Sequence, residues 1–244
     1  MLKRSDFESN LLGREVAQLP PALADQCDVA LAAERWRRDG IWLVSCRIPA
    51  GNQAAERRLL AAGFRCVEVL VTHRRDFTGA EQPAAGVRLA CPEDRSAILA
   101  IAASAFRHDR LHADPQIPDW AADVVRAHWI ANDLAGRADA NIVVEHDGRV
   151  AGFLLGLRRE PGAVIDLIAV APEFQGRRLA GKLVESVPAL MGMPTVGSLV
   201  AGTQDANVQS MAFYARNGFA ETGRQLTFHW VNGDVAPSQD PRPI

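Results

Sequence analysis

The pattern of apolar and polar positions divides the chain into alternating helices and strands. Apolar residues recur at helical spacing in "NQAAERRLLAAG" (52–63), "DWAADVVRAHWIANDLAG" (119–136) and "LAGKLVESVPAL" (179–190). The first two segments end in a glycine, which commonly adopts the left-handed conformation that closes a helix. A further helix is predicted from "LPPALAD" to "RRDG" (19–40).

Strand patterns lie between these helices. Residues 41–48 of "IWLVSCRIP" are typical of a buried strand that Pro49 ends, and "FRCVEVLVTHRR" (64–75) alternates like a strand. "NIVVEHDGRVAGFLLGLRR" (141–159) is typical of two strands joined by an Asp-Gly turn. Further strands are predicted in "GVRLA", "GAVIDLIAVAP", "TVGSLVAGT" and "FAETGRQLTFHW". The alternation of the two kinds of element predicts an α/β (α+β) fold in which helices flank a sheet.

Composition changes once along the chain, and this change predicts a domain boundary. "DFTGAEQPAAG" (76–86) is rich in small residues, glycine and proline and has no periodicity, so we expect a linker. The linker separates a smaller domain (1–75) from a larger one (87–231). The polar, proline-rich residues 232–244 are expected to form a flexible tail.

Two segments of equal length resemble each other. Asn52–Gly63 and Asn207–Gly218 each follow a strand, run through a helix to a Gly-Phe pair and continue as a strand. Leu59 in the first segment stands where Tyr214 stands in the second. One interpretation is a duplicated strand-helix-strand unit whose first copy has lost the hydroxyl. The other is that Gly-Phe after a helix recurs by chance, because glycine is a common helix stop.

Composition and charge narrow the classes of partner. The net charge of −2 and pI near 6.3 give no general attraction to nucleic acid or to an anionic membrane, so neither is expected as a partner. No apolar run has the length of a membrane span. The cysteines at 27, 46, 66 and 91 are widely spaced, which favours buried reduced thiols, a cytoplasmic location and no metal site.

The stretch with the most candidate ligand-binding residues is the turn that follows the strand "IDLIAVAP". Backbone N–H groups at a helix start are unpaired and attract anions. Gly176, Ala180 and Gly181 leave room for a phosphate, and Arg177 and Arg178 add positive charge. These residues predict a diphosphate site, although a helix cap without a ligand has much the same pattern.

Two motifs resemble the GCN5-related N-acetyltransferases (the GNAT superfamily). "VAPEFQGRRLAGKLV" resembles their acetyl-CoA-binding signature Q/R-x-x-G-x-G/A: Gln175 and Ala180 match its ends, while Arg178 replaces the middle glycine. "NVQSMAFYARNGF" resembles their Asn-x-x-(Ser/Ala)-x-x-x-Tyr-x-x-x-Gly-Phe element. The matches to this element are Asn207, Ser210, Tyr214, Gly218 and Phe219.

The resemblance implies a GNAT fold, a mixed and mostly antiparallel twisted sheet flanked by helices, preceded by a smaller degenerate GNAT-like half-domain. It also implies acetyl-CoA as co-substrate, with its pantetheine arm along the strand and its pyrophosphate in the turn. The cofactor-binding residues implied in this way are Ile168, Ala169, Val170, Gln175, Gly176, Arg177, Arg178, Leu179, Ala180, Gly181, Asn207 and Ser210.

By the same resemblance, Tyr214 lies near the sulfur and protonates the leaving thiolate. It is the only tyrosine of the chain, and a phenol with a pKa near 10 stays protonated at neutral pH. The alternative is a core ring whose hydroxyl meets a surface water. For the base that takes the proton of the amine, Asp166 is preferred because it interrupts an apolar strand, and Glu145 and His146 stay open.

The loop "RHDRLHADPQIP" is the expected acceptor side, because the segment between the first two helices of a GNAT protein usually borders that pocket. Arg107, His108, Arg110 and His112 are predicted to bind a diphosphate or carboxylate. The alternative is a solvated polar loop. The spacing of the two histidines also suits a metal, which this superfamily does not need.

The domain layout resembles, more loosely, bacterial dTDP-fucosamine acetyltransferases. This resemblance implies transfer of acetyl to the primary amine of a nucleotide-linked (dTDP) amino sugar. Other small amines, amino acids and protein N-termini stay open as acceptors, and so does a non-catalytic acyl-CoA-binding module. The sequence leaves open the acyl-chain preference and the oligomeric state, a homodimer included.

Overall fold

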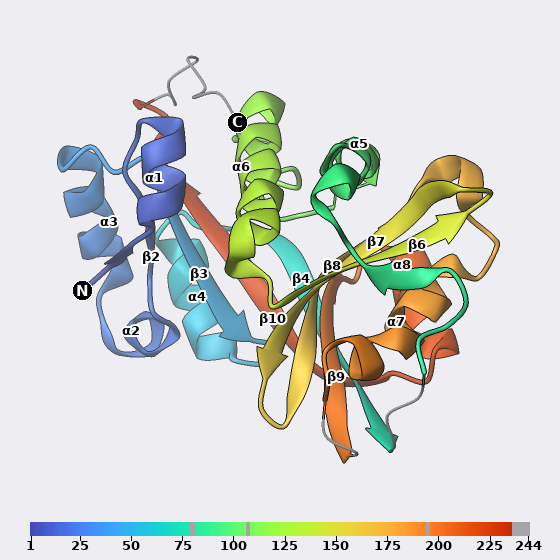
Figure 1. The fold of residues 1–244 in the computed structure, drawn as a ribbon. Coiled ribbons are helices and arrows are strands. Elements are labelled where there is room, and N and C mark those ends of the chain that lie inside the picture. Colours follow the sequence, from blue (N-terminus) through green and yellow to red (C-terminus); the bar gives the residue numbers. More distant parts are fainter. Residues whose placement is uncertain (79–81, 106–107, 194–195, 236–244) are drawn as a thin grey trace.

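One sheet runs through both halves of the chain (Figure 1). The computed structural model describes residues 1–78, 82–105, 108–193 and 196–235. Its strands are β1 (Lys3–Arg4), β2 (Val16–Gln18), β3 (Leu43–Pro49), β4 (Arg65–Thr78), β5 (Val87–Leu89), β6 (Ala140–His146), β7 (Arg149–Arg159), β8 (Gly162–Val170), β9 (Val196–Gln204) and β10 (Ala220–Val231). They lie in the order β1-β2-β3-β10-β4-β9-β8-β7-β6-β5.

Among the described residues, the neighbouring strands β2–β3 and β8–β9 are parallel and the other neighbours antiparallel. The predicted mixed, mostly antiparallel sheet is therefore confirmed. The predicted Asp-Gly turn joins β6 to β7, and Asp147 and Gly148 both have positive φ there (50° and 71°).

Helices flank this sheet. They are α1 (Asp6–Leu12), α2 (Pro21–Gln26), α3 (Val29–Arg38), α4 (Gln53–Ala61), α5 (Arg95–Ala105), α6 (Asp119–Asn132), α7 (Leu179–Leu190) and α8 (Val208–Arg216), with short helical turns η1 (Pro92–Asp94), η2 (Asp133–Arg137) and η3 (Pro172–Phe174). Figure 1 shows α5 and α6 on one side of β6–β8 and α7 on the other. The contacts of α7 extend from β5 to β8.

The similarity between residues 52–63 and 207–218 extends to the details of both helices. Asn52 and Asn207 each cap their helix by accepting a hydrogen bond from the backbone N–H three residues on, at 3.2 and 3.0 Å. Gly63 and Gly218 follow the two helices with φ of 85° and 77°. The matching caps at both ends favour the interpretation that β3-α4-β4 and β9-α8-β10 are two copies of one unit.

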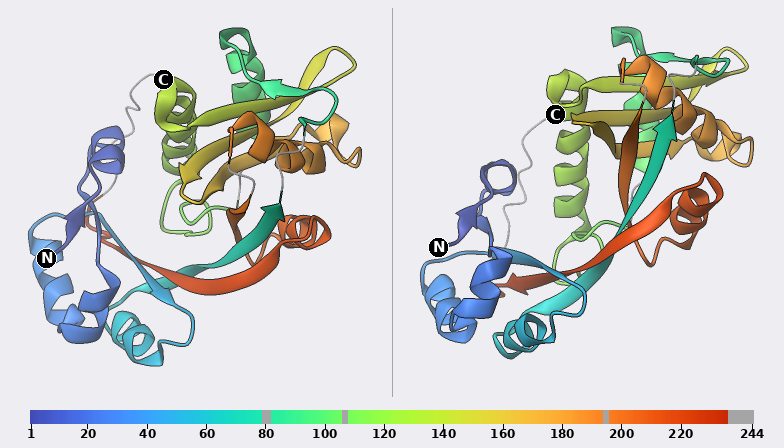
Figure 2. Two further views of the ribbon diagram at one scale, coloured as in Figure 1. Left: turned by 60° about the horizontal axis from the view of Figure 1, so that its bottom comes forward. Right: turned by 90° about the horizontal axis from the view of Figure 1, so that it is seen from below.

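The two copies interleave their strands, as the left view of Figure 2 shows for β4 and β10. β10 lies between β3 and β4 of the first copy, and β4 lies between β10 and β9 of the second. The predicted linker over 76–86 is therefore wrong in its first three residues: Asp76, Phe77 and Thr78 continue β4 and pair with β9. The predicted boundary falls inside a strand that both halves share.

Two further predictions are corrected in the first half. The helix expected over 19–40 is two helices, because the chain is extended after α2 and Asp28 starts α3 by accepting a hydrogen bond from the Leu31 N–H (3.0 Å). Of the four cysteines, Cys46 alone is buried; all four thiols are free.

The first residue of the predicted tail packs against the rest of the protein. Asn232 is buried, and its N–H donates to the Trp42 carbonyl at 2.8 Å. Residues 236–244 of that prediction lie outside the described residues. In the part of the chain that the structure describes, no helix combines the length and apolar character that crossing a membrane requires.

A buried cluster joins the two halves of the chain. α6 contributes Ala121 and Val125, and the first half contributes Leu12, Val16 and Trp42. Burial of these apolar groups holds α6 against the first half. Side chains from α1, β3 and α6 consequently border one common space, which forms part of the site described below.

Candidate active site

The parallel pair β8–β9 opens halfway along its length. The last paired residues are Ile165 and Ala201, yet β8 continues to Val170 and β9 to Gln204. Beyond this point the edge of β8 that faces β9 has backbone groups without a strand partner. Such groups pair with other partners, such as an extended ligand. The predicted pantetheine-binding residues 168–170 lie in this opening.

The turn after β8 places backbone N–H groups at a helix start. The first helical bond of α7 runs from the Lys182 N–H to the Arg178 carbonyl (3.2 Å), so the N–H groups of residues 179–181 lie before it and point out of the helix end. Gly176 has φ of 76°, and Gln175 folds back to donate to the Val170 carbonyl (3.3 Å). The predicted cofactor residues 175–181 thus form one continuous turn into a helix start, a geometry that suits an anion.

Arg178 adopts the conformation of the glycine that it replaces. Its φ of 61° and ψ of 15° lie in the left-handed region, which costs a side-chain-bearing residue about 1 kcal/mol. The substitution in the signature therefore keeps the shape of the turn at the expense of backbone strain.

Arg178→Gly is expected to raise the melting temperature by about 2–4 °C, because it relieves roughly 1 kcal/mol of strain in a domain of this size. Thermal unfolding measures this. Arg177→Gly is the matched control: it removes the neighbouring charge where φ is not left-handed, and the added flexibility should lower the melting temperature. A lower melting temperature for Arg178→Gly would contradict the assignment of strain.

Tyr214 lies on α8 within a group of aromatic rings. Only 4% of it is exposed. Its ring stacks on His73 (centroids 5.2 Å apart, interplanar angle 25°) and meets Phe213 and Phe219 edge to face, each at 5.2 Å. Burial raises the pKa of the Tyr214 hydroxyl well above its usual value, so the group keeps its proton throughout the neutral range.

His73 brings the first half of the chain to this tyrosine. It lies on β4, and its Nδ1 is buried without a hydrogen-bond partner among the described residues. Burial lowers the pKa of His73, so the ring that stacks on Tyr214 is neutral at neutral pH. In the sequence, His73 is only a residue near the end of a predicted strand. The order of residues along the chain does not reveal that β4 and β10 become neighbours, which brings His73 next to Tyr214.

The tyrosine helix and the phosphate turn lie on the same side of the sheet. Tyr214 and Leu179, the first residue of α7, belong to one buried cluster. Asn217 at the end of α8 approaches α7 so closely that a Cβ on Gly181 would lie 3.0 Å from its Oδ1. A side chain at position 181 would therefore require the Asn217 side chain to shift slightly.

Asp166 is the first residue of β8 beyond the paired stretch. Its Oδ2 accepts a hydrogen bond from the Trp129 indole N–H (3.1 Å) and forms an ion pair with Arg137. Arg137 also pairs with the buried Asp133 (2.5 Å) and covers the Trp129 ring at 4.8 Å. Two carboxylates thus share one guanidinium beside the opening between β8 and β9.

Asp133 makes this cluster sensitive to pH. Burial, reinforced by the charge of Asp166, raises the pKa of Asp133 to about 6 despite its bond to Arg137. A carboxyl whose pKa is raised on folding contributes stability below its unfolded pKa, near 4, and loses it as pH rises to about 6. A shift of this size corresponds to roughly 3 kcal/mol.

We expect Asp133→Asn to gain stability relative to the wild type as pH rises from 4 to 7, by roughly 3 kcal/mol, because an amide has no proton to lose. Urea unfolding at both pH values measures the gap. Asp119→Asn, at the exposed start of α6, is the control. A gap that is the same at both pH values would contradict the raised pKa.

The two other candidate bases lie in the β6–β7 hairpin. Glu145 is paired with Arg88 (2.6 Å). His146 contacts Arg177 (2.6 Å) and the ring of Phe174. Glu145 and His146 line neither of the two cavities described in the next paragraph, whereas Asp166 lines the smaller one.

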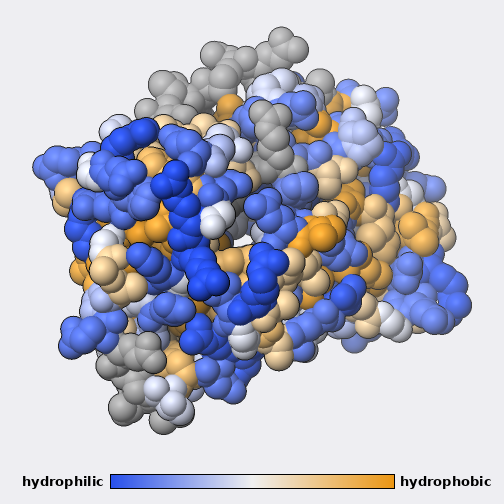
Figure 3. Space-filling view, turned by 90° about the vertical axis from the view of Figure 1, so that its right-hand side faces the viewer, coloured by the Kyte–Doolittle hydropathy of each residue, from blue (hydrophilic) through white to orange (hydrophobic). Residues whose placement is uncertain are grey.

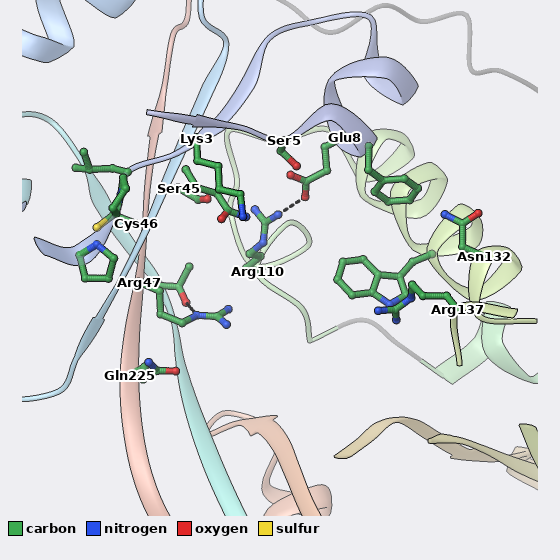
Figure 4. A pocket seen from close by; sticks show the side chains of 17 residues that line it. Lys3, Ser5, Glu8, Ser45, Cys46, Arg47, Arg110, Asn132, Arg137 and Gln225 are labelled. Atoms are coloured by element: carbon green, nitrogen blue, oxygen red, sulfur yellow. Dashed lines mark hydrogen bonds and ion pairs between the residues drawn. The ribbon is translucent and has the colours of Figure 1, made fainter. Parts of the chain in front are cut away.

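A cavity of 870 Å³ lies between the first half of the chain and α6 (Figure 4). A second cavity of 170 Å³ adjoins it, and the two share Glu8, Arg47, Arg110 and Trp129 in their walls. The smaller one extends to Asp166. Neither Tyr214 nor the turn at residues 175–181 is among the residues that line them.

Comparison with known proteins decides the family. The model of the "Acetyltransferase (GNAT) family" matches residues 97–219. The chain belongs to this family. A GNAT protein from Sphaerobacter thermophilus has the same fold: its crystal structure superposes with a TM-score of 0.59 at 17% identity, covering 89% of this chain and 73% of that one.

Two curated relatives have sequences closer to this GNAT chain. The spore coat polysaccharide biosynthesis protein SpsD of Bacillus subtilis (strain 168) is 36% identical over 145 residues, which are 59% of this chain and 50% of that protein. The 5-NmdU N-acetyltransferase of Pseudomonas phage PaMx11 is 34% identical over 86 residues, 34% of this chain and 59% of the phage protein. The chain thus spans only about half the length of the relatives that it matches.

In this GNAT protein, the predicted acceptor residues have different environments. Arg110 lines both cavities. His112 uses both ring nitrogens within the protein, on Asp109 (2.5 Å) and Asp123 (3.0 Å). Although burial opposes it, these two carboxylates raise the pKa of His112. With both nitrogens engaged, His112 holds the loop in place and has none free for a substrate.

Of the remaining acceptor predictions, only His108 lies among the described residues. His108 is exposed and lines neither cavity, and Arg107 lies outside the described residues. Sequence reasoning missed Lys3, Arg47 and Trp129, which line the larger cavity from the first half and from α6. The only sequence signal for any of these three residues was the helical spacing that places Trp129 on the apolar face of the predicted helix 119–136.

Asn207 has a structural contact that the motif did not reveal. Its side-chain oxygen accepts the Ser210 N–H as the cap of α8. Its amide nitrogen and the second lone pair of its oxygen are left for the pantetheine contact that the resemblance implies.

Proposed function

We propose that this chain is an acetyl-CoA-dependent N-acetyltransferase that acetylates the primary amine of a nucleotide-linked amino sugar, with a dTDP-linked sugar as the leading case. The observation that carries the proposal is the opening between β8 and β9, which has an anion-binding helix start at one end and a buried phenol on the same side of the sheet. Membership of the GNAT family supports acetyl transfer.

The two curated relatives support the choice of acceptor. One is named for the biosynthesis of a spore coat polysaccharide, the other for N-acetylation of 5-NmdU. The first name is consistent with an amino sugar as the acceptor. The second name favours a different candidate, a modified nucleotide.

In the proposed reaction, the acceptor nitrogen attacks the thioester carbonyl carbon of acetyl-CoA. Asp166 takes a proton from that nitrogen, directly or through water. The carbon–sulfur bond breaks, and Tyr214 gives its proton to the leaving sulfur. Trp129 and Arg137 hold the Asp166 carboxylate at the edge of the acceptor cavity.

The environment of each group suits its role. The raised pKa of Tyr214 keeps its proton available until the thiolate forms. Phosphates at the start of α7 meet unpaired N–H groups, the positive end of the helix dipole and the charge of Arg178. We place the reaction in the cytoplasm, whose reducing conditions suit four free thiols.

Thiol release from acetyl-CoA across a panel of acceptors tests the proposal. The panel contains dTDP-linked 4-amino sugars, an aminomethylated deoxyuridine nucleotide, amino acids and N-terminal peptides. We expect turnover with the nucleotide-linked sugars above all others. Tight CoA binding without turnover on any acceptor would show a non-catalytic acyl-CoA-binding module instead.

A further inference from the structure

The first copy of the duplicated unit also contains an opening between parallel strands. β2 pairs with β3 in parallel as far as Gln18 and Ser45, as β8 pairs with β9 in the second copy. After Gln18 the chain turns away into α2, while β3 continues to Pro49. This opening forms one wall of the 870 Å³ cavity, which is lined here by Gln18, Leu19, Pro20, Ser45, Cys46 and Arg47.

The opening of the first copy lacks the parts that would hold CoA. Where the second copy has its glycine- and arginine-containing turn, the first has Pro20 and Pro21 at the start of a helix of six residues. Proline has no N–H to offer a phosphate. Leu59 replaces the tyrosine. The first copy therefore keeps a cleft without keeping a cofactor site.

Several cationic side chains line this cavity. Four of its lining residues are positively charged (Lys3, Arg47, Arg110 and Arg137), and the only acidic one is Glu8. Each of the three arginines is also ion-paired with a carboxylate: Arg47 with Glu68, Arg110 with Glu8, and Arg137 with Asp133 and Asp166. Figure 4 shows Lys3, Arg47 and Arg110 pointing into the same part of the cavity from β1, β3 and the loop before α6.

The two arginines are held in fixed positions. Arg47 donates from Nε to Thr227 Oγ1 and from Nη2 to Glu68 Oε1, both at 2.9 Å. Arg110 pairs with Glu8 and contacts His229 Nε2 at 3.1 Å. Each arginine therefore has guanidinium N–H groups beyond these bonds to offer a ligand.

A buried dyad sets the direction of Arg110. His229 and Asp114 are both fully buried and bonded through Nδ1 at 2.9 Å. Burial lowers the pKa of His229, so the ring is neutral, its Nδ1–H donates to Asp114 and its Nε2 accepts from Arg110. A guanidinium preorganised in this way is suited to recognise phosphate.

We propose that this cavity binds the phosphate groups of the acceptor, a nucleoside diphosphate sugar, with Arg47 and Arg110 as the ligands of the diphosphate. This inference rests on the proposed function, because it locates the nucleotide of that acceptor. The cleft of the degenerate copy has thus become the nucleotide subsite of the active copy. Phe7 and Trp129, packed edge to face at 6.3 Å, form an aromatic wall beside it.

The dimensions of the cavities suit this assignment. Ligand sites commonly have volumes of about 300–1,000 Å³, and the larger cavity has 870 Å³. The adjoining cavity extends to Asp166. A phosphate held by Arg47 and Arg110 therefore leaves the sugar amine directed toward the candidate base and the opening of β8.

Titration calorimetry with dTDP alone tests this site without any turnover. We expect dTDP to bind the wild type, and Arg47→Met or Arg110→Met to weaken binding by about 10- to 100-fold, as the loss of a charged hydrogen bond implies. Arg224→Met, which removes an exposed arginine paired with Glu221, is the matched control and should bind dTDP normally. CoA binding should be unchanged in every variant.

Glu8→Gln provides a test in the opposite direction. It removes the acidic group that competes for Arg110, so dTDP should bind about 3- to 10-fold more tightly. Failure of dTDP to bind the wild type, or equal binding by the wild type and the arginine variants, would overturn the inference even if acetyl transfer to some amine is observed. Arginine-dependent binding of dTDP without acetyl transfer would support the site and overturn the proposed function.

Discussion

Tyr214→Phe is expected to lower kcat by about 100-fold or more, because phenylalanine fills the same space without a proton for the leaving sulfur. The ring contacts with His73, Phe213 and Phe219 do not involve the hydroxyl, so the fold and the affinity for CoA should stay the same. Steady-state kinetics with the best acceptor of the panel, together with thermal unfolding, measure both effects.

Val208→Ala is the control for this variant. Val208 lies at the exposed start of the same helix, and its truncation should leave kcat unchanged. A Tyr214→Phe enzyme with wild-type turnover would remove the hydroxyl from the reaction and leave the ring as a packing element. If Tyr214→Phe lowered the melting temperature together with kcat, the hydroxyl would be assigned a role in packing and not in the reaction.

Ala180→Asp is expected to weaken CoA binding by about 100-fold or more. The carboxylate would stand at the start of α7 among the N–H groups assigned to the pyrophosphate. At about 5 Å and an effective dielectric constant of about 20, each pair of like charges costs roughly 3 kcal/mol. The same carboxylate interacts favourably with the helix dipole by about 0.5 kcal/mol, so the protein should be no less stable.

The opposite signs of these two effects make Ala180→Asp informative. Ala180→Ser, which adds a smaller polar group without charge, should bind CoA nearly as the wild type does. Calorimetry with CoA and thermal unfolding of both variants separate binding from stability. Equal CoA affinity in the aspartate and serine variants would mean that no phosphate lies at this helix start.

The cofactor side of the site was predictable from the sequence because its parts are local. The turn at 175–181 and the opening of β8 lie within one stretch of chain, and their geometry follows from a strand end, a glycine and a helix start. Even the substitution at Arg178 left the backbone shape intact. The roles of these residues in binding and catalysis stay predictions until the variants above are measured.

The acceptor side was not predictable in the same way, because its parts are far apart in the chain. Arg47 and Glu68 meet Gln204 and Thr227 only because β4 and β10 change places between the two copies. Neither periodicity nor composition shows which strands of two similar units become neighbours. The same exchange brings His73 onto Tyr214 and places the first three residues of the predicted linker inside a strand.

The loop before α6 shows a second limit of sequence reasoning. Its arginines and histidines have the composition of a binding loop, but the role of each depends on its neighbours. His112 is engaged by two carboxylates of its own surroundings, whereas Arg110 is directed into the cavity. Composition identified the loop, and packing decided which of its side chains face a ligand.

A crystal structure of the protein with acetyl-CoA and dTDP tests the central claim most directly. We expect pyrophosphate oxygens of CoA about 3 Å from the N–H groups of residues 179–181, as in ordinary hydrogen bonds, and its sulfur next to the Tyr214 hydroxyl, with dTDP in the cavity at Arg47 and Arg110. CoA bound instead in the cleft between β2 and β3, with its sulfur away from Tyr214, would contradict the account.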